Sequence, residues 1–140
     1  MSTDDLAFAR DVAAHPVSLS WDEGCSGVEY EGEHRPFRWC TGAGLLRIHN
    51  ALPFRRSVSI RMKLYAAQPP AKLKLDGLLS GTIDLVGLVT FAREISLPPG
   101  DHVVRFACDG KPAYAPGDSR TLVWHISSFT IDEIRVPGAP

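Results

Sequence analysis

Hydrophobic and polar residues alternate with a period of two along most of the chain after Pro16. The clearest case is SVSIRMKLYA (57–66), where Val58, Ile60, Met62 and Leu64 would face one side and the residues between them the other. Similar runs occur at 17–21, 44–50, 71–77, 90–97, 102–110 and 120–136. This alternation predicts strands that each bury one face.

Turn-forming residues separate these runs at Pro69–Pro70, Asp76–Gly77, 98–101, Asp109–Gly110 and 116–118. Roughly seven or eight short strands without helical patterns between them are typical of an antiparallel sandwich, not of an α/β fold. We therefore predict an all-β, jelly-roll-like antiparallel β-sandwich over residues 17–136, followed by a tail at 137–140.

One short helix is predicted ahead of the sandwich, within an N-terminal segment of residues 1–16. Thr3 can cap a helix from Asp4 to Ala14, acidic residues stand in its first turn, and Pro16 ends it. The same segment lacks the apolar core of a secretory signal, and the most apolar stretch, 83–92, is too short to span a bilayer. We expect a cytoplasmic protein with no direct membrane insertion.

The charge balance bears on possible partners, and the cysteine content bears on disulfide formation. The 140 residues include 15 basic and 16 acidic side chains, a balance that offers no general attraction for nucleic acid. Cys25, Cys40 and Cys108 are an odd number without CxxC spacing. One disulfide with one free thiol is an alternative, but we favour three reduced, largely buried cysteines.

The sequence predicts neither a metal site nor catalysis. The histidines are scattered, and the acidic stretch 22–33, interpreted as a solvated loop, lacks the spacing of a calcium-binding EF-hand loop. GxSxG, P-loop and HExxH motifs are absent, and the glycines at 42–44 precede a strand, not a helix. We predict a chain that is not an enzyme and needs no cofactor.

Aromatic and planar charged side chains favour a binding function. Aromatic faces stack on the C–H surfaces of sugars, and planar charged groups hydrogen-bond to hydroxyls. The predicted ligand-binding residues are Trp39, Arg38, Glu29, Asp118, Arg120, Tyr30 and Trp21.

An architectural interpretation of these side chains stays open. Trp124 and Phe129 are expected to pack in the core, and Phe37 to enter it. Arg38 and Arg120 can instead form structural ion pairs with Glu29 and Asp118. The alternative to a carbohydrate-binding module is thus a structural or protein-interaction sandwich without a small-molecule ligand.

Four short motifs give a family resemblance over residues 17–135. They are a Gly-x-x-Gly-x-Glu stretch (Gly24, Gly27, Glu29), an aromatic–Arg–Trp motif (Phe37, Arg38, Trp39), a Pro-Pro-Gly turn (98–100) and a Pro-x-Asp-x-Arg-x-Leu stretch (Pro116, Asp118, Arg120, Leu122). The chain resembles the β-sandwich accessory domain of bacterial cell-surface polysaccharide enzymes, namely membrane glycosyltransferases, sulfatase-like phosphotransferases and some methyltransferases.

The resemblance implies a sandwich fold and an association with surface glycan synthesis. It also implies a glycan, a partner protein or a parent enzyme domain as the partner. The resemblance carries no catalytic residues over to this chain. The chain departs from the family in that its 140 residues include no catalytic or membrane portion.

Overall fold

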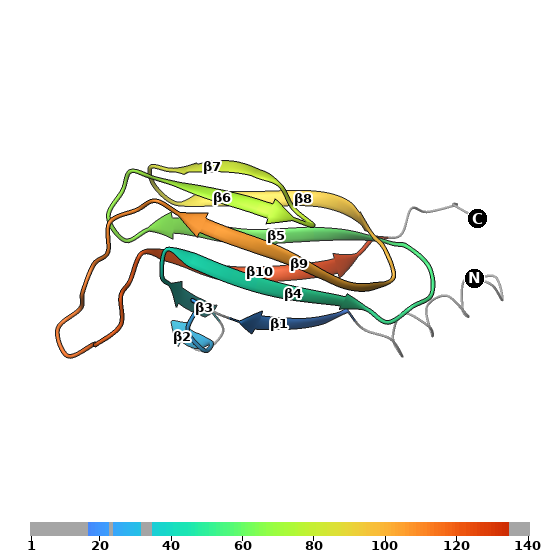
Figure 1. The fold of residues 1–140 in the computed structure, drawn as a ribbon, viewed down its shortest axis with the longest axis horizontal. Helices are drawn as coiled ribbons and strands as arrows, with labels where there is room; N and C mark the ends of the chain where they lie inside the picture. The colour runs from blue at the N-terminus through green and yellow to red at the C-terminus, as the bar shows by residue number, and fades with distance from the viewer. Residues whose placement is uncertain (1–16, 23, 32–34, 135–140) are drawn as a thin grey trace.

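Two antiparallel sheets lie face to face in the computed structural model, which describes residues 17–22, 24–31 and 35–134 (Figure 1). The prediction of an all-β antiparallel sandwich is confirmed for these residues. The helix predicted at 4–14 and the tail at 137–140 lie outside them.

The first sheet has the order β1-β4-β9-β6-β7. Its strands are β1 (Ser18–Asp22), β4 (Ala43–Asn50), β9 (Gly100–Cys108), β6 (Ala71–Gly77) and β7 (Gly81–Leu85). The second sheet has the order β2-β3-β10-β5-β8, with β2 (Glu29–Glu31), β3 (Arg35–Cys40), β10 (Trp124–Glu133), β5 (Arg56–Ala66) and β8 (Val89–Leu97). Strands β2, β3 and β7 are not among the predicted strands.

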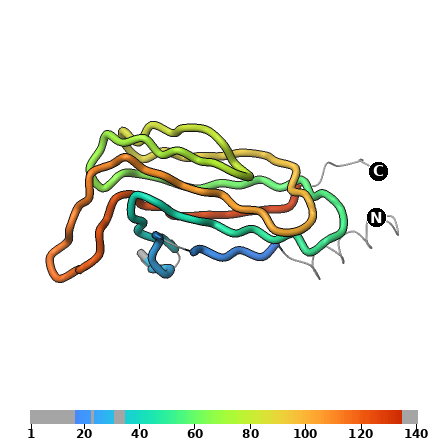
Figure 2. Tube along the Cα trace, in the orientation of Figure 1, coloured from blue at the N-terminus to red at the C-terminus, as the bar shows by residue number. Residues whose placement is uncertain are grey.

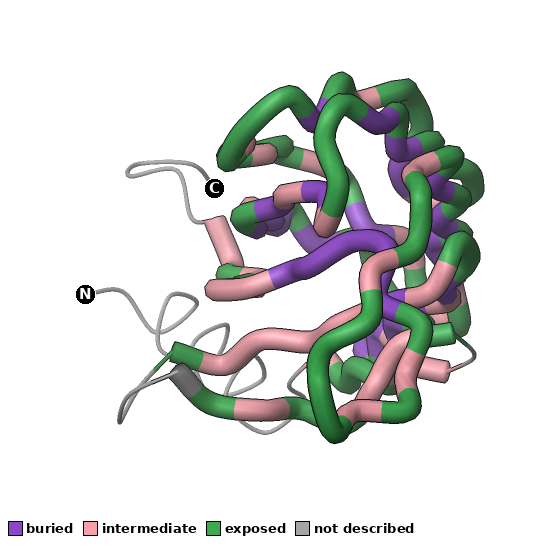
Figure 3. The backbone as a smooth tube through the Cα atoms, turned by 90° about the vertical axis from the view of Figure 1, so that its left-hand side faces the viewer, coloured by how far each residue is buried: buried purple, intermediate pink, exposed green. Residues whose placement is uncertain are grey.

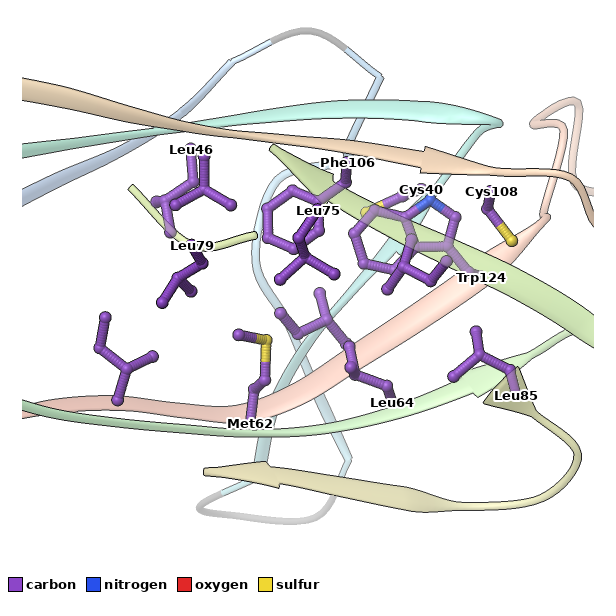
Figure 4. Close-up of a cluster of buried hydrophobic side chains, with 14 of the residues drawn as sticks. Cys40, Leu46, Met62, Leu64, Leu75, Leu79, Leu85, Phe106, Cys108 and Trp124 are labelled. Atoms are coloured by element: carbon purple, nitrogen blue, oxygen red, sulfur yellow. The ribbon is translucent and has the colours of Figure 1, made fainter. Parts of the chain in front are cut away.

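The core lies between the sheets and follows the predicted alternation. Val58, Ile60, Met62 and Leu64 of β5 are at most 1% exposed, while exposed and half-buried positions lie between them. Figure 3 shows buried stretches of backbone toward the middle of the molecule and exposed stretches around them. Met62 and Leu64 of the second sheet point toward Phe106 of the first sheet across the interior (Figure 4). Trp124 comes from β10, next to β5 in the same sheet, and its ring centroid lies 5.1 Å from that of Phe106. Apolar burial of this kind supplies the main stabilisation of the fold.

One end of the sandwich carries the segments that bear on function. The long connection between β9 and β10 extends beyond the strands at this end, and β2 and β3 lie at the same end (Figure 2). Ala113 and Leu122 pair through two backbone hydrogen bonds of 2.7 and 3.1 Å, and the Val123 N–H donates to the Cys40 carbonyl at 2.9 Å. These bonds attach the base of the connection to the end of β3.

The described residues contain no helix with the length and hydrophobicity needed to cross a bilayer.

Replacing Leu64 by Ala should lower the free energy of unfolding by about 2–5 kcal/mol, because a fully buried side chain is removed and a cavity is left. Urea denaturation followed by circular dichroism measures the change. The neighbouring exposed residue gives a matched control: Lys63→Ala should stay within about 0.5 kcal/mol of the unmodified chain. Equal losses for both variants would contradict the assigned faces of β5.

Candidate binding site

A disulfide between Cys25 and Cys40 attaches the segment after β1 to the end of β3. Beside it, the Ser26 N–H donates to the Trp39 carbonyl at 2.8 Å, and the Thr41 N–H donates to the Gly24 carbonyl at 2.7 Å. The prediction of three reduced cysteines is therefore wrong. Strand pairing places the two thiols together although they are 15 residues apart, and only Cys108 is free and buried.

Glycine is required where this segment crosses the first sheet. Gly24 has a φ of +83°, and a Cβ there would overlap the carbonyl oxygen of Ala43. A Cβ on Gly44 would lie 2.9 Å from the Cys25 sulfur and 3.1 Å from the Trp124 ring. The absence of both side chains lets the disulfide pack directly against the first sheet.

Arg120 joins two carboxylates at the base of the β9–β10 connection. Its Nη1 donates to Glu29 Oε2 at 2.7 Å, and its Nε and Nη2 donate to the Asp118 carboxylate at 3.0 and 2.7 Å. The backbone N–H of Arg120 also donates to Asp118 Oδ1 at 2.9 Å. The ion pairs expected for Arg120 are present, and they bring together residues 91 positions apart.

These hydrogen bonds shift both partners toward their charged forms. They lower the pKa of Asp118 to about 2, and the bonds to Asp118 and then Glu29 raise the pKa of Arg120. All three side chains are between 24% and 38% exposed, so solvent screens the cluster and its net effect on stability is small. Its main consequence is a fixed position for the Arg120 guanidinium.

An aromatic cluster covers the outer face of the second sheet next to these charges. Trp39, His125 and Tyr65 occupy adjacent positions on β3, β10 and β5. The His125 ring stacks between Phe37 and Tyr65, at centroid distances of 4.9 and 4.3 Å. The Trp39 ring stands nearly perpendicular to Tyr65 and His125, at 89° and 75°.

A hollow of about 250 Å³, here called the outer pocket, lies beside Trp39. It is lined by Trp39, Arg120 and the disulfide residue Cys25, together with Gly24, Ser26, Thr41, Thr121 and Leu122. An indole ring, a fixed guanidinium and apolar surface therefore meet in one concave site.

Arg38 lies on the opposite side of β3, because successive side chains of a strand point to opposite faces. Its Nη1 donates to the Ser26 carbonyl at 2.8 Å, and its guanidinium carbon lies 5.6 Å from the centroid of the Trp21 ring. Burial lowers the pKa of Arg38, and the nearby Tyr30 opposes that shift. The ion pairs expected between Arg38 and Glu29 or Asp118 are absent among the described residues.

Arg38 and Trp21 line a second hollow of about 230 Å³, here called the inner groove. It lies between the edge strand β1 of the first sheet and strands β3 and β10 of the second. Its other lining residues are Leu19, Val28, Pro36, Phe37, Ile126, Ser127 and Phe129.

The structure thus divides the predicted site residues into two groups. Trp39 and Arg120 line the outer pocket, and Glu29 and Asp118 are hydrogen-bonded to Arg120, whereas Arg38 and Trp21 meet at the inner groove. Tyr30 is 63% exposed and pairs with Pro36, which places it on the Arg38 side of the second sheet.

Three of the aromatic predictions can be compared with the structure. Trp124 is fully buried and Phe129 packs against the core, as predicted. Phe37 is half-buried and stacks on His125 instead of entering the core, so that prediction is wrong.

Sequence reasoning missed Tyr65 and His125 as members of the site. The period of β5 does place Tyr65 on the outer face, but only the cross-strand register sets it beside His125 and Trp39. Among the described residues, no group of three or more His, Cys, Asp or Glu side chains is placed to hold a metal ion. Positions 23, 32 and 33 of the acidic stretch lie outside that description.

Comparison with known proteins shows similarity of structure only. No protein-family model matches the sequence, and no curated protein matches it. The CBM22-1 xylan-binding domain of Xyn10C from Paenibacillus barcinonensis is 10% identical, with a TM-score of 0.53 over 84% of this chain and 86% of that one.

Two further solved structures have a TM-score of 0.47. TmCBM61, in complex with β-1,4-galactotriose, is 15% identical over 85% of this chain and 89% of that one. The N-terminal cellulose-binding domain of β-1,4-glucanase C from Cellulomonas fimi is 6% identical over 84% and 90%. The similar structures are carbohydrate-binding modules with a β-sandwich fold, and the fold is what the likeness establishes.

Removing the disulfide in a Cys25→Ser/Cys40→Ser variant should lower the free energy of unfolding by about 3 kcal/mol. A cross-link over 15 residues restricts the unfolded chain by roughly that amount. Urea denaturation of the oxidised chain and of the variant measures the difference. Replacing the unpaired Cys108 by Ala serves as the control for loss of a thiol. An unchanged midpoint in the double variant would contradict a structural role of the bridge.

Asp118 should titrate at about pH 2 in the folded chain, because Arg120 stabilises its charged form. Its folded pKa lies below the ordinary 3.8, so its contribution to stability is present above pH 3.8 and is lost as the pH falls toward 2. Carboxyl ¹³C NMR measures the midpoint, and Arg120→Gln should move it up toward 3.8. A midpoint near 3.8 in the unmodified chain would show that the ion pair is absent in solution.

Proposed function

We propose that this chain is a non-catalytic carbohydrate-binding module whose ligand lies in the outer pocket against Trp39. The observation that carries the proposal is the placement of the Trp39 ring beside Arg120, which is already held by Glu29 and Asp118. A sugar offers a C–H face to an aromatic ring and hydroxyls to planar polar groups. The fold shared with carbohydrate-binding modules supports this proposal.

Trp39 is the ring best suited to stack on a sugar. The rings of Phe37, His125 and Tyr65 turn their faces toward one another, so those faces are already occupied. Trp39 meets His125 and Tyr65 at steep angles, and no ring among the described residues stacks on either of its faces. Its position is fixed by the disulfide at the adjacent Cys40, which reduces the ordering cost of binding.

The charged cluster supplies the polar half of the site. Glu29 accepts from Arg120 through Oε2, which leaves Oε1 as an acceptor for a sugar hydroxyl. The Arg120 guanidinium is held on both sides by carboxylates, so its remaining N–H groups have a defined direction. Ion pairing within the cluster and contact with a ligand are therefore compatible roles for the same side chains.

The motif resemblance extends the proposal to a biological setting. In this setting the module is an accessory unit of an enzyme that assembles a cell-surface polysaccharide, and that enzyme is its partner. Structural disulfides persist in oxidising compartments, so the Cys25–Cys40 bridge favours a site of action outside the cytoplasm instead of the cytoplasmic location expected from the sequence.

One observation favours protein interaction as a second function. Val86 and Leu88 are 71% and 64% exposed at the turn between β7 and β8, which are the edge strands of the two sheets. Adjacent exposed apolar side chains at a sheet edge are a common feature of protein contacts. This turn carries neither of the two hollows, so contact with a protein there leaves the outer pocket accessible.

Trp39→Ala should weaken carbohydrate binding roughly tenfold to a hundredfold, since a stacking aromatic at the centre of a site typically contributes about 2 kcal/mol or more. Affinity electrophoresis in gels that contain xylan, β-1,4-galactan or β-1,4-glucan measures the retardation of the native chain and the variant. Tyr114→Ala is the matched control, because Tyr114 is a 68% exposed aromatic on the β9–β10 connection that lines neither hollow.

Arg120→Lys should also weaken retardation, because lysine keeps the charge but loses the planar donor fork. Circular dichroism confirms that each variant is folded. The proposal is wrong if none of these three polysaccharides retards the native chain, or if Tyr114→Ala and Trp39→Ala reduce retardation equally.

A further inference from the structure

The inner groove combines apolar walls with a single cationic side chain. Leu19, Val28, Phe129 and Ile126 contribute aliphatic and aromatic surface from strands or segments of both sheets. Arg38 and Ser127 are the polar side chains among the lining residues, and Trp21 covers one side of the Arg38 guanidinium. The groove therefore presents one charge in largely apolar surroundings.

Arg38 has no carboxylate partner among the described residues, unlike several other arginines of the chain. Arg47, Arg56 and Arg120 each form an ion pair with a carboxylate, whereas no carboxylate among the described residues pairs with Arg38. Its one hydrogen bond within the described part of the chain is the 2.8 Å bond from Nη1 to the Ser26 carbonyl. A guanidinium has five N–H donors in a planar fork, so the described residues use only a small part of its donor capacity.

Burial is unfavourable for a guanidinium that has no carboxylate partner among the described residues. Desolvation lowers the pKa of Arg38, as expected for a cation partly removed from water. A half-buried charge in apolar surroundings is stabilised when an anion supplies hydrogen bonds to it. The groove is thus electrostatically complementary to an anion.

We propose that the inner groove is a second binding site, which takes a carboxylate carried on a ring-shaped body. The carboxylate would accept two parallel hydrogen bonds from the Arg38 fork. The body would pack on the apolar wall lined by Leu19, Val28 and Phe129, next to the Trp21 ring, which Phe129 meets edge to face at a centroid distance of 5.6 Å. Ser127 offers one further hydrogen bond at the rim of the groove.

A neutral sugar fits this groove less well than a carboxylate does. A neutral sugar can form hydrogen bonds with Arg38, Ser127 and the Trp21 indole N–H, but it lacks the negative charge that strengthens hydrogen bonds from a guanidinium. Two sources can supply the required chemistry: a uronic acid residue of a polysaccharide, or a free aromatic acid. Both present a carboxylate on a ring-shaped body, and they differ in the number of hydroxyls on that body.

This site is separate from the one proposed at Trp39. Residues 38 and 39 point to opposite faces of β3, and the two hollows share no lining residue. A variant that abolishes binding at one site should therefore leave binding at the other unchanged. The two proposals can thus fail independently, and the experiments distinguish the two failures.

The test is an NMR titration of the full chain that follows the Arg38 Nε–H and Trp21 indole resonances. The probes are sodium glucuronate and sodium 4-hydroxycinnamate, with methyl glucoside and 4-hydroxycinnamyl alcohol as their uncharged counterparts and acetate as a carboxylate without a body. At least one of the two carboxylates should shift both resonances in a saturable manner. The uncharged counterparts and acetate should bind at least roughly tenfold more weakly.

Variants assign the effect to Arg38. Arg38→Gln keeps the length of the side chain and removes its charge, and it should weaken binding at least roughly tenfold. Arg105→Gln is the control, because Arg105 is an exposed arginine of β9 that lines neither hollow. Trp39→Ala should leave carboxylate binding unchanged.

Each possible result decides the proposal. A response to glucuronate alone identifies an acidic sugar as the source, and a response to the cinnamate alone identifies a free aromatic acid. No saturable shift with either probe, equal binding of the uncharged counterparts, or an equal loss in Trp39→Ala would overturn it. If Arg38→Gln does not fold, the resonances that shift in the native chain still decide where the carboxylate binds.

Discussion

Strand β3 is held at its end by the Cys25–Cys40 disulfide, and both hollows depend on that attachment. The bridge, the backbone bonds around Ser26 and the bond from Val123 to the Cys40 carbonyl surround the last residues of the strand. Strand β3 is also paired on both sides, with β10 over four residues and with the three-residue edge strand β2, and the bridge adds a covalent attachment at its end. The disulfide therefore helps to fix the positions of Arg38 and Trp39, which directly precede Cys40.

The alternation of a strand then gives these neighbouring side chains different roles. Trp39 points outward to the aromatic cluster and the Arg120 ion pairs, whereas Arg38 points inward to Trp21 and the edge of the core. Arg120 has strong charged partners, and Arg38 has a carbonyl and an indole face. This difference underlies our two proposals: a sugar that stacks on Trp39 in the outer pocket, and a ligand with one negative charge beside Arg38 in the inner groove.

The sequence predicted the fold well where burial has a simple period. Strand β5 alternates cleanly, and its inward face was identified residue by residue. Strand β3 was missed because most of its residues are half-buried on both faces, so its sequence shows no clear alternation. Strands β2 and β7 were missed because they are short strands at the edges of their sheets. The disulfide could not be inferred from spacing, since only the pairing of segments 15 residues apart brings the two thiols together. For the same reason the sequence grouped Arg38 with Trp39 and gave no sign of His125.

The most direct test of the account follows the indole N–H resonances of the three tryptophans during titration with a neutral xylo- or galacto-oligosaccharide. Trp39 lies at the outer pocket, Trp21 at the inner groove and Trp124 in the core, so each reports on a different part of the molecule. The account predicts a saturable shift at Trp39, with Trp21 and Trp124 nearly unchanged. A bound oligosaccharide that leaves Trp39 unshifted, or that shifts Trp21 instead, would contradict it.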